Sequence, residues 1–477
     1  MAVCAKFWYM KEFAIHLEPE QKKPLYEQIY EAVRDGILEG HIPQGEKLPS
    51  TRFEAEFLSC SRSTVELAYD QLLSEGYIRS EPYRGYYACD VRELYHLTDR
   101  IQHTDVPGSE KEQPQPEYRV DFSPNGIELS QFPFPVMGRI MKNLMLDEGE
   151  QMLQSSAPFG EPDLRQSICD YLFRSRNVAC SPEQIIIGAG NEYLLIALCQ
   201  MLGADHAVAM ESPTYLRAFR TFRNIGYAVR PIDMDRNGMR VDMLEDAFAD
   251  IVYVMPSHQF PMGTVMPMKR RLELLQWAAR GEDRYIIEDD YDSEFRYRGK
   301  PIPALQGLDR SGRVVYLGTF SRSIAPSTRV SYLVLPRQLL EKYREHCGFY
   351  ACTVPVIMQK SIYHFIQEGY FERNLNRMRG VYKAKHDFIL GELRKCRWIR
   401  KILGENSGLH LLAEIDTDLT EEELIRRCKE MGIRVYGLSE YFLNGSSGLQ
   451  HPVLLFGYGG LTEDEMMDGL QCIASIV

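Results

Sequence analysis

The chain has 477 residues, a formal net charge of −12 and 44% hydrophobic residues. This length suggests two or three domains with a large buried core, and the acidic balance excludes a generally polybasic, histone-like role but not a local DNA-binding patch. The 11 cysteines include no CxxC pair, and no run approaches the ~20 apolar residues that span a bilayer, so we expect a cytoplasmic protein with reduced thiols.

The first predicted element is an amphipathic helix after Pro24. Leu25, Ile29, Val33 and Ile37 recur every four residues, which is the spacing of one helix face. Pro24 itself suits the first turn of a helix. We therefore expect a helix that packs this apolar face into the core of a small N-terminal domain.

Two short helices and a hairpin are predicted next. Thr51 with Glu54, and Ser63 with Glu66, fit capping boxes at the two helix starts. The tight SCS turn between these helices predicts a helix-turn-helix. The segment YIRSEPYRGYYACDV then alternates like a β-hairpin, with Gly85 near its turn, and we interpret it as a wing.

The motifs LPSTR, SRSTV, LLSEGYI and RGYY, in this order, closely resemble the winged helix of GntR-family proteins over about residues 22–91. The resemblance implies a DNA-binding domain at 20–91 in which SRSTV opens the recognition helix, whose first residues reach base edges in the major groove. Without it, a protein-binding module would be an equal alternative, because residues 45–91 hold more acids than bases. The residues that the resemblance assigns to DNA or its backbone are Arg52, Arg62, Ser63, Thr64, Arg79, Arg84 and Gly85.

A change in composition follows the small domain. Residues 92–118 are polar and contain GSEKEQPQP, and low apolar content with Pro, Gln and Glu is typical of a linker. The sequence thus predicts a linker at 92–118 between the winged helix and a larger domain at 119–477.

The larger domain shows short apolar runs that alternate with helical patterns. This alternation predicts an α/β fold with a mainly parallel central sheet, in which ligands bind at the carboxyl ends of the strands. Five polar clusters stand at such ends, namely GAGNEY, ESPTY, SHQFPMG, EDDYD and GTFSRS, so we expect one pocket. The runs are 185–188, 207–210, 251–256, 284–289, 313–318 and 331–336.

These clusters, with IIEDDYDSEFRYRG, LGTFSRSIAPSTR and GYFERNLNRMR, resemble fold-type I aminotransferases. More closely, they resemble the aminotransferase-like half of MocR-type regulators, and the resemblance extends from about residue 20 to 477. It implies a homodimeric transcriptional regulator that binds operator DNA. It also implies that the large, PLP-transferase-like domain binds pyridoxal phosphate (PLP) and senses a small-molecule effector.

The resemblance also implies a role for single residues. Asp289 would face the pyridine nitrogen, where a carboxylate keeps the ring protonated. Tyr291 would bond the phenolic oxygen, and Tyr215 would line the ring. The phosphate would lie at a helix start, where free backbone N–H groups suit an anion, and its implied binding residues are Gly190, Asn191, Ser321 and Arg329. We assign His258 no chemistry and expect no metal site.

Arg322 stands where the MocR subfamily has its Schiff-base lysine. Capture of a carbonyl group needs a neutral amine, whereas a guanidinium stays protonated and is a poor nucleophile. Lys269 and Lys300 lie out of reach by sequence position. We therefore expect no covalent PLP, no turnover and no catalytic residue.

Three interpretations of the pocket stay open. PLP or its amine form binds non-covalently, or the pocket has changed to another anionic ligand with Arg322 as a new cation beside Arg329, or the domain is only a dimerisation scaffold. The rival to a transcriptional regulator is a PLP-dependent aminotransferase with an accessory DNA-binding domain.

Overall fold

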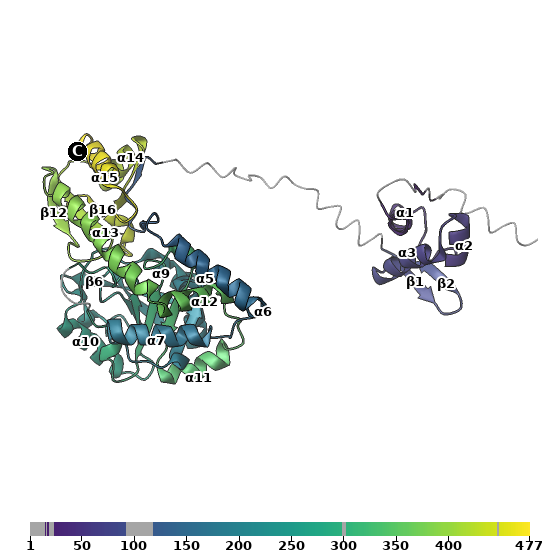
Figure 1. Cartoon of the computed structure of the whole chain (residues 1–477), viewed down its shortest axis with the longest axis horizontal. Helices are drawn as coiled ribbons and strands as arrows, with labels where there is room; N and C mark the ends of the chain where they lie inside the picture. The colour runs from purple at the N-terminus through teal and green to yellow at the C-terminus, as the bar shows by residue number, and fades with distance from the viewer. Residues whose placement is uncertain (1–14, 16, 19–22, 92–117, 298–301, 446–447) are drawn as a thin grey trace, which may run out of the picture. The chain divides into compact units, whose positions relative to one another are not determined.

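The chain divides into two compact units, Met1–Gln115 and Pro116–Val477 (Figure 1). No helix among the described residues is long and apolar enough to cross a membrane. The linker predicted at 92–118 lies outside the described residues, apart from Tyr118. The computed structural model describes residues 15, 17–18, 23–91, 118–297, 302–445 and 448–477.

The first unit is a winged helix-turn-helix. Its first helix buries Ile29, Val33 and Ile37 as predicted, and these side chains pack against Val65 and Leu72 of the third helix. The wing is an antiparallel hairpin. The elements are α1 (Leu25–Glu39), α2 (Thr51–Phe57), α3 (Arg62–Ser74), β1 (Ile78–Glu81) and β2 (Gly85–Ala88).

The two predicted capping boxes are wrong by one and two residues. Ser50 caps α2 and Ser61 caps α3, each hydroxyl accepting the backbone N–H three residues on at 3.2 Å. Thr51 is instead the first residue of α2 and is buried, while Ser63 lies inside α3. The sequence offers several hydroxyl side chains at each start, and only the backbone conformation selects the one that caps.

A mainly parallel sheet forms the centre of the second unit. Among the described residues its strand order is β4-β11-β10-β9-β8-β5-β6-β7, and β11 runs antiparallel to both of its neighbours. All six predicted runs form strands of this sheet, whereas β6 and β7 were not predicted. The strands are β4 (Ile185–Gly188), β5 (Ala207–Ser212), β6 (Ala228–Asp235), β7 (Gly238–Met239), β8 (Ile251–Val254), β9 (Tyr285–Asp290), β10 (Val314–Thr319) and β11 (Ser331–Val334).

Helices cover both faces of this sheet (Figure 1). Along β4, Ile186 packs into the core under α8, α9 and α11, whereas Ile185 and Ile187 pack on the opposite side against α5, α7 and α12. This alternation is the period of a strand buried on both faces. The helices are α5 (Phe134–Asp147), α6 (Gly149–Met152), α7 (Pro162–Arg176), α8 (Asn191–Leu202), α9 (Leu216–Ile225), α10 (Met268–Ala279), α11 (Arg337–His346), α12 (Val356–Gln367) and α13 (Tyr370–Leu393).

The C-terminal part forms a smaller layer around an antiparallel sheet of order β12-β13-β16-β15. Val120 in β3 pairs with Ile433 in β14, so the start of the second unit is anchored to its end. This pairing also sends the following segment, with Asn125, toward the central sheet. The elements are β3 (Val120–Asp121), β12 (Ile399–Leu403), β13 (His410–Ile415), α14 (Glu421–Glu430), β14 (Ile433–Arg434), β15 (Tyr436–Gly437), β16 (Val453–Gly457) and α15 (Glu463–Ala474).

Candidate functional site

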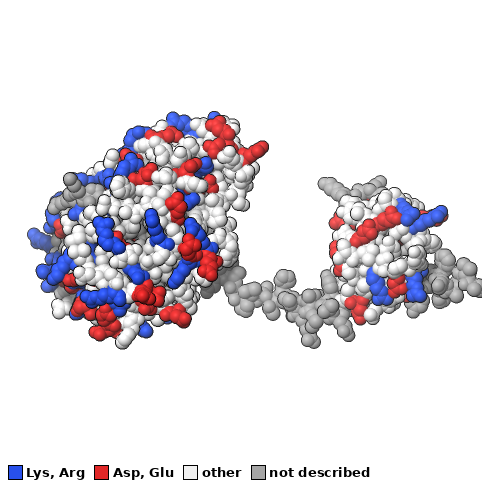
Figure 2. All heavy atoms as spheres, turned by 90° about the horizontal axis from the view of Figure 1, so that it is seen from below, with Lys and Arg blue, Asp and Glu red and all other residues white. Residues whose placement is uncertain are grey.

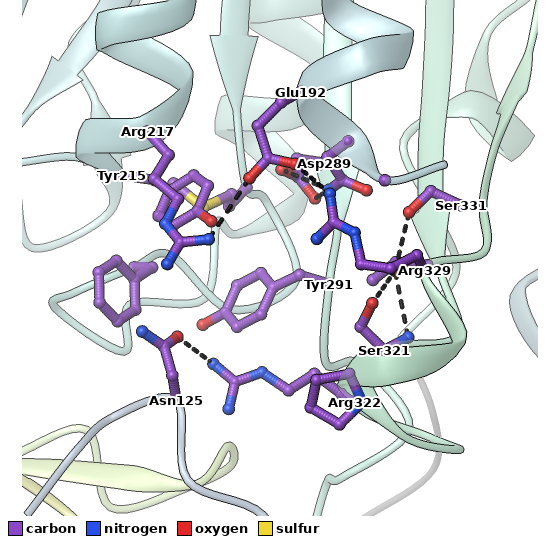
Figure 3. Close-up of a pocket in the computed structure, with 16 residues that line it drawn as sticks. Asn125, Glu192, Tyr215, Arg217, Asp289, Tyr291, Ser321, Arg322, Arg329 and Ser331 are labelled. Carbon is purple, nitrogen blue, oxygen red and sulfur yellow. Dashed lines mark hydrogen bonds and ion pairs between the residues drawn. The ribbon is translucent and has the colours of Figure 1, made fainter. Parts of the chain in front are cut away.

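The carboxyl ends of five strands surround an open pocket of about 220 Å³ (Figure 3). Residues after β4, β5, β8, β9 and β10 line it, so each of the five polar clusters of the sequence contributes. The structure brings together all eight residues that the sequence assigned to a cofactor, which are Gly190, Asn191, Tyr215, Asp289, Tyr291, Ser321, Arg322 and Arg329.

Asp289 is a buried residue near the end of β9, with 3% of its surface exposed. The hydroxyl of Tyr253 donates a hydrogen bond to it, and the Asn191 side-chain amide lies 3.4 Å from both of its oxygens. Burial raises the pKa of Asp289 to about 7, although the bond from Tyr253 lowers it. Near neutral pH this group can therefore accept a proton from a ligand or donate one to it.

Glu192 lies between two arginines at the rim of the pocket (Figure 3). Its carboxylate is 3.5 Å from Arg217 Nη1 and 3.2 Å from Arg329 Nη2. Burial works to raise the pKa of Glu192, but a backbone N–H and the two arginines outweigh it and lower the pKa. The charge of Arg329 is thus already shared with a carboxylate of the chain itself.

Gly190 comes directly before the first turn of α8 and has a φ of 101°. A Cβ at this position would lie 2.2 Å from Arg329 Nη2. A side chain at this position would therefore be strained by the backbone conformation and would have to displace the guanidinium of Arg329. The N–H groups of the first helical turn have no partner within the helix, which makes this end of α8 suitable for an anion.

Arg322 follows β10 and reaches the opposite side of the pocket (Figure 3). Its Nη2 donates to Asn125 Oδ1 at 2.9 Å, and its guanidinium carbon lies 6.0 Å from the centre of the Tyr291 ring. Its Nη1 is buried without a hydrogen-bond partner among the described residues. Ser321, the preceding residue, instead turns back to Thr319, whose hydroxyl lies 3.1 Å from its own.

His258 contacts the hydroxyl group of Tyr291. The Tyr291 hydroxyl lies 2.9 Å from His258 Nδ1, and the same nitrogen lies 2.8 Å from Asp292 Oδ2. His258 is itself buried. It is thus a hydrogen-bonded core histidine, and its contacts fix the orientation of the Tyr291 ring.

Several lining residues were missed from the sequence. Glu192 and Arg217 stand next to predicted residues, in GAGNEY and just after ESPTY, so their position was a usable signal. Asn125 gave none, because it lies far upstream of the strands and reaches the pocket through the β3–β14 pairing. Lys269 lies on α10 with an 89% exposed side chain, and Lys300 lies outside the described residues.

The predicted DNA-contacting residues cluster on α2, the start of α3 and the wing. Arg52, Arg62, Ser63, Arg79 and Arg84 are exposed. Thr64 and Gly85 are half-buried.

The arginines of this surface stand beside acidic side chains. Arg62 pairs with Glu66 at 2.8 Å, while Arg79 and Arg84 lie 3.4 and 3.6 Å from Glu81. Figure 2 shows Lys and Arg interleaved with Asp and Glu on the visible face of this unit. Exposed pairs of this kind are weak, about 0–1 kcal/mol, so phosphate groups could displace the acids.

Both units match known families. Residues 25–87 match the family "Bacterial regulatory proteins, gntR family" and residues 127–447 match "Aminotransferase class I and II". The chain is 39% identical to the HTH-type transcriptional regulator YdeL of Bacillus subtilis, over 94% of this chain and 96% of the relative. It is 33% identical to the probable rhizopine catabolism regulatory protein MocR of Rhizobium meliloti, over 96% and 95%.

The chain belongs to the MocR-type transcriptional regulators. Solved structures agree on the fold of the second unit of this MocR-type protein. An archaeal alanine:glyoxylate aminotransferase superposes with a TM-score of 0.68 at 24% identity, over 75% of this chain and 90% of that one. A kynurenine aminotransferase from Pyrococcus horikoshii gives 0.67 at 22%, over 80% and 93%. The sequence-based identification of family and fold class is therefore confirmed.

The pocket of this MocR-type regulator fits PLP only in part. Asp289 could face a ring nitrogen, and the start of α8 with Ser321 and Arg329 could receive a phosphate. The part of the site that would capture the aldehyde of PLP does not fit this cofactor, because the described lining residues include no lysine. Arg322 stands at the position where the resemblance places the Schiff-base lysine.

Proposed function

We propose that this regulator binds operator DNA as a cytoplasmic homodimer and senses a small anionic molecule in the pocket without covalent chemistry. The observation that supports this proposal most strongly is the position of Arg322. This non-nucleophilic cation lines the pocket where an amine would have to attack the aldehyde of PLP. PLP, when an enzyme holds it, supplies an electron sink for reactions of amino acids. Here the residues would only bind and orient such a ring, with Asp289 at its nitrogen.

The absorption spectrum of the protein mixed with PLP tests this proposal. Wild-type protein should give no band of a covalently bound cofactor, whereas Arg322→Lys, which restores an amine at this place, should gain one. Arg322→Met is the matched control, because it removes the guanidinium without adding an amine and reports background reaction of surface lysines. A borohydride-stable adduct at the pocket of wild-type protein would overturn the proposal in favour of an aminotransferase.

The DNA-binding part of the proposal concerns the start of α3. Arg62 is exposed at the first position of this helix, where recognition helices reach base edges. Arg62→Ala should weaken binding to the protein's own promoter region by about 1–3 kcal/mol if Arg62 contacts a base. Lys269→Ala, on the exposed face of α10 in the other unit, should leave affinity unchanged. An unaltered affinity of Arg62→Ala, measured by fluorescence anisotropy, would show that another surface binds the DNA.

We propose further DNA contacts from the resemblance to GntR-family winged helices. Arg52, like Arg62, would bind a guanine edge or a phosphate, and Arg79 and Arg84 of the wing would bind the DNA backbone. Ser63 and Thr64 lie in the first turn of α3, and Gly85 lets the wing turn with a φ of 108°.

A further inference from the structure

Arg322 differs from the other two arginines of the pocket in its partners. Arg217 and Arg329 both contact the carboxylate of Glu192. Among the residues that the structure describes, the only hydrogen-bond acceptor of the Arg322 guanidinium is the neutral amide oxygen of Asn125, and its Nη1 is buried without an acceptor. A buried donor without an acceptor costs free energy. The uncompensated cation of the pocket is therefore Arg322.

The other end of the pocket carries a buried carboxyl group and one acceptor without a hydrogen-bond partner. Asp289 is buried with Tyr253 and Asn191 as its hydrogen-bond partners. The side-chain oxygen of Asn191 is itself buried and lacks a partner in the described part of the chain. A ligand group that donates a hydrogen bond, such as a protonated ring nitrogen, would satisfy this end. Because burial raises the pKa of Asp289 to about 7, the protonated carboxyl group can also donate a hydrogen bond to an unprotonated ring nitrogen.

Aromatic side chains line the space between these two ends (Figure 3). Tyr291 lies under the guanidinium of Arg322, and Phe260 packs edge-on to Tyr215 with ring centres 5.9 Å apart. Burial is the largest cause that raises the pKa of Tyr215, and the smaller effects of Arg217 and Arg322, which lower it, and of Asp289, which raises it, show that Tyr215 lies near charges of both ends. The pocket thus has an acidic end, a flat apolar middle and a basic end.

We propose that the ligand is a planar heteroaromatic carboxylate whose ring nitrogen lies opposite the carboxylate, with the carboxylate on Arg322 and the nitrogen at Asp289. This inference rests on the proposed sensing function and names the chemical class of its ligand. A guanidinium matches a carboxylate by two parallel hydrogen bonds. A carboxylate on the ring carbon opposite the nitrogen lies on the axis through that nitrogen, with one oxygen on each side of the axis, so the two functional groups of the ligand point to opposite ends of the pocket.

A phosphate is a less suitable partner for this pocket. The arginine at the start of α8 is Arg329, and any phosphate there must compete with Glu192, which is 3.2 Å away. Glu192 is also held by Arg217, so displacing it breaks two ion pairs. Arg322 has no such competitor among the described residues. A ligand without phosphate can therefore use the unpaired cation and leave the Glu192 cluster intact.

The first test compares ligands that differ in one group, by isothermal titration calorimetry on the full-length protein. 4-Pyridoxate and pyridoxine share one ring and differ in a carboxylate against an alcohol at the carbon opposite the nitrogen. We expect 4-pyridoxate to bind at least about tenfold more tightly, as expected for a charge-assisted pair. Isonicotinate should likewise bind more tightly than benzoate, which lacks the ring nitrogen. Equal affinities within either pair would overturn the proposal.

The second test determines whether Arg322 binds the carboxylate of the ligand. Arg322→Gln should weaken 4-pyridoxate at least about tenfold and weaken pyridoxine less, whereas Lys269→Ala, on the exposed face of α10, should leave the 4-pyridoxate affinity unchanged. An unaltered 4-pyridoxate affinity of Arg322→Gln would place the carboxylate on another group and refute the proposal. Because the ligand pairs are compared on wild-type protein, the proposal stays testable if Arg322→Gln does not fold.

Measuring promoter affinity with and without ligand tests the proposed ligand class and the proposed sensing function separately. If 4-pyridoxate binds as expected but does not change the affinity for the promoter fragment, the ligand class is correct and the sensing role fails. If PLP changes promoter affinity while 4-pyridoxate does not bind, the sensing role stands and the ligand class is wrong.

Discussion

Asp289 and Glu192 are two carboxyl groups of one pocket whose pKa values are shifted in opposite directions. Burial is the largest influence on both and raises the pKa of each. For Glu192 the backbone and two arginines reverse it, whereas Asp289 has only neutral hydrogen-bond donors and keeps a raised pKa of about 7. One group is thus a fixed anion, and the other can change charge at physiological pH. Environments that separate two pKa values in this way assign different tasks to the two groups.

The raised pKa of Asp289 makes a pH-dependent stability prediction. A carboxyl with a folded-state pKa of about 7 binds more protons folded than unfolded between roughly pH 4 and 7, so its contribution to stability falls as the pH rises through this window. Asp289→Asn has no such proton. Its unfolding free energy relative to wild type should therefore rise between pH 4 and 8, by a few kcal/mol at most at about 1.4 kcal/mol per pKa unit.

Urea denaturation of both proteins at several pH values measures this difference. Taking the difference from wild type cancels the buried acids that both proteins retain, among them Glu211 and Glu288, whose pKa values burial also raises to about 7. A difference that is flat across this pH range would show that Asp289 is already ionised in the folded protein.

Pocket residues could be predicted from the sequence where they lie at the ends of strands. Asp289, Tyr291 and Ser321 come directly at or after apolar runs, and parallel strands bring such ends together. The partners of these residues were not predictable, because they depend on side-chain reach across the folded pocket. No spacing in the sequence shows that Glu192 lies between two arginines, or that Asn125 meets Arg322.

At the scale of elements, the short buried strands were predictable and the partly polar ones were not. The six apolar runs are buried on both faces, so their sequence is continuously hydrophobic. Strand β6 reads AVRPIDMD and is largely accessible, and a proline within a run argues against a strand. It forms nonetheless, because β5 pairs with it in parallel along six residues.

The junction of β4 and α8 gives a prediction about Gly190. Gly190 and Gly203 share a backbone conformation, with φ and ψ of 101° and 163° at Gly190 and of 93° and 171° at Gly203, but an added Cβ meets Arg329 only at Gly190 and has nothing within 4 Å at Gly203. Gly190→Ala and Gly203→Ala should lose similar stability, about 1–3 kcal/mol, since the Arg329 side chain is 52% exposed and can move aside. Because Gly190 lies at the proposed phosphate site, only Gly190→Ala should reduce any rise in melting temperature that PLP gives.

This pair of variants separates strain from contact. The loss in Gly203→Ala measures the backbone conformation alone, because its Cβ occupies open space. If both variants responded to PLP as wild type does, Arg329 would have no part in holding the phosphate. Thermal unfolding with and without PLP gives both quantities in one experiment.

For the whole molecule, the balance of charge limits how DNA is bound. The chain carries a net charge of −12, and the exposed arginines of α3 and the wing stand beside Glu66 and Glu81. Non-specific binding of DNA depends on unpaired basic side chains that replace counterions. A single winged helix of this kind should therefore bind weakly, and tight binding should require two of them on one dimer.

This argument predicts a large effect of valency on operator affinity. On the promoter fragment, a probe with two half-sites should bind at least about 100-fold more tightly than a probe in which one half-site is scrambled, because the second contact becomes intramolecular. Arg62→Ala, which acts on each half-site contact, should weaken both probes and affect the two-site probe more. Analytical ultracentrifugation should show a dimer at the same protein concentration. Equal affinity for the two probes would mean that one winged helix suffices, and a dimer would then add nothing to recognition.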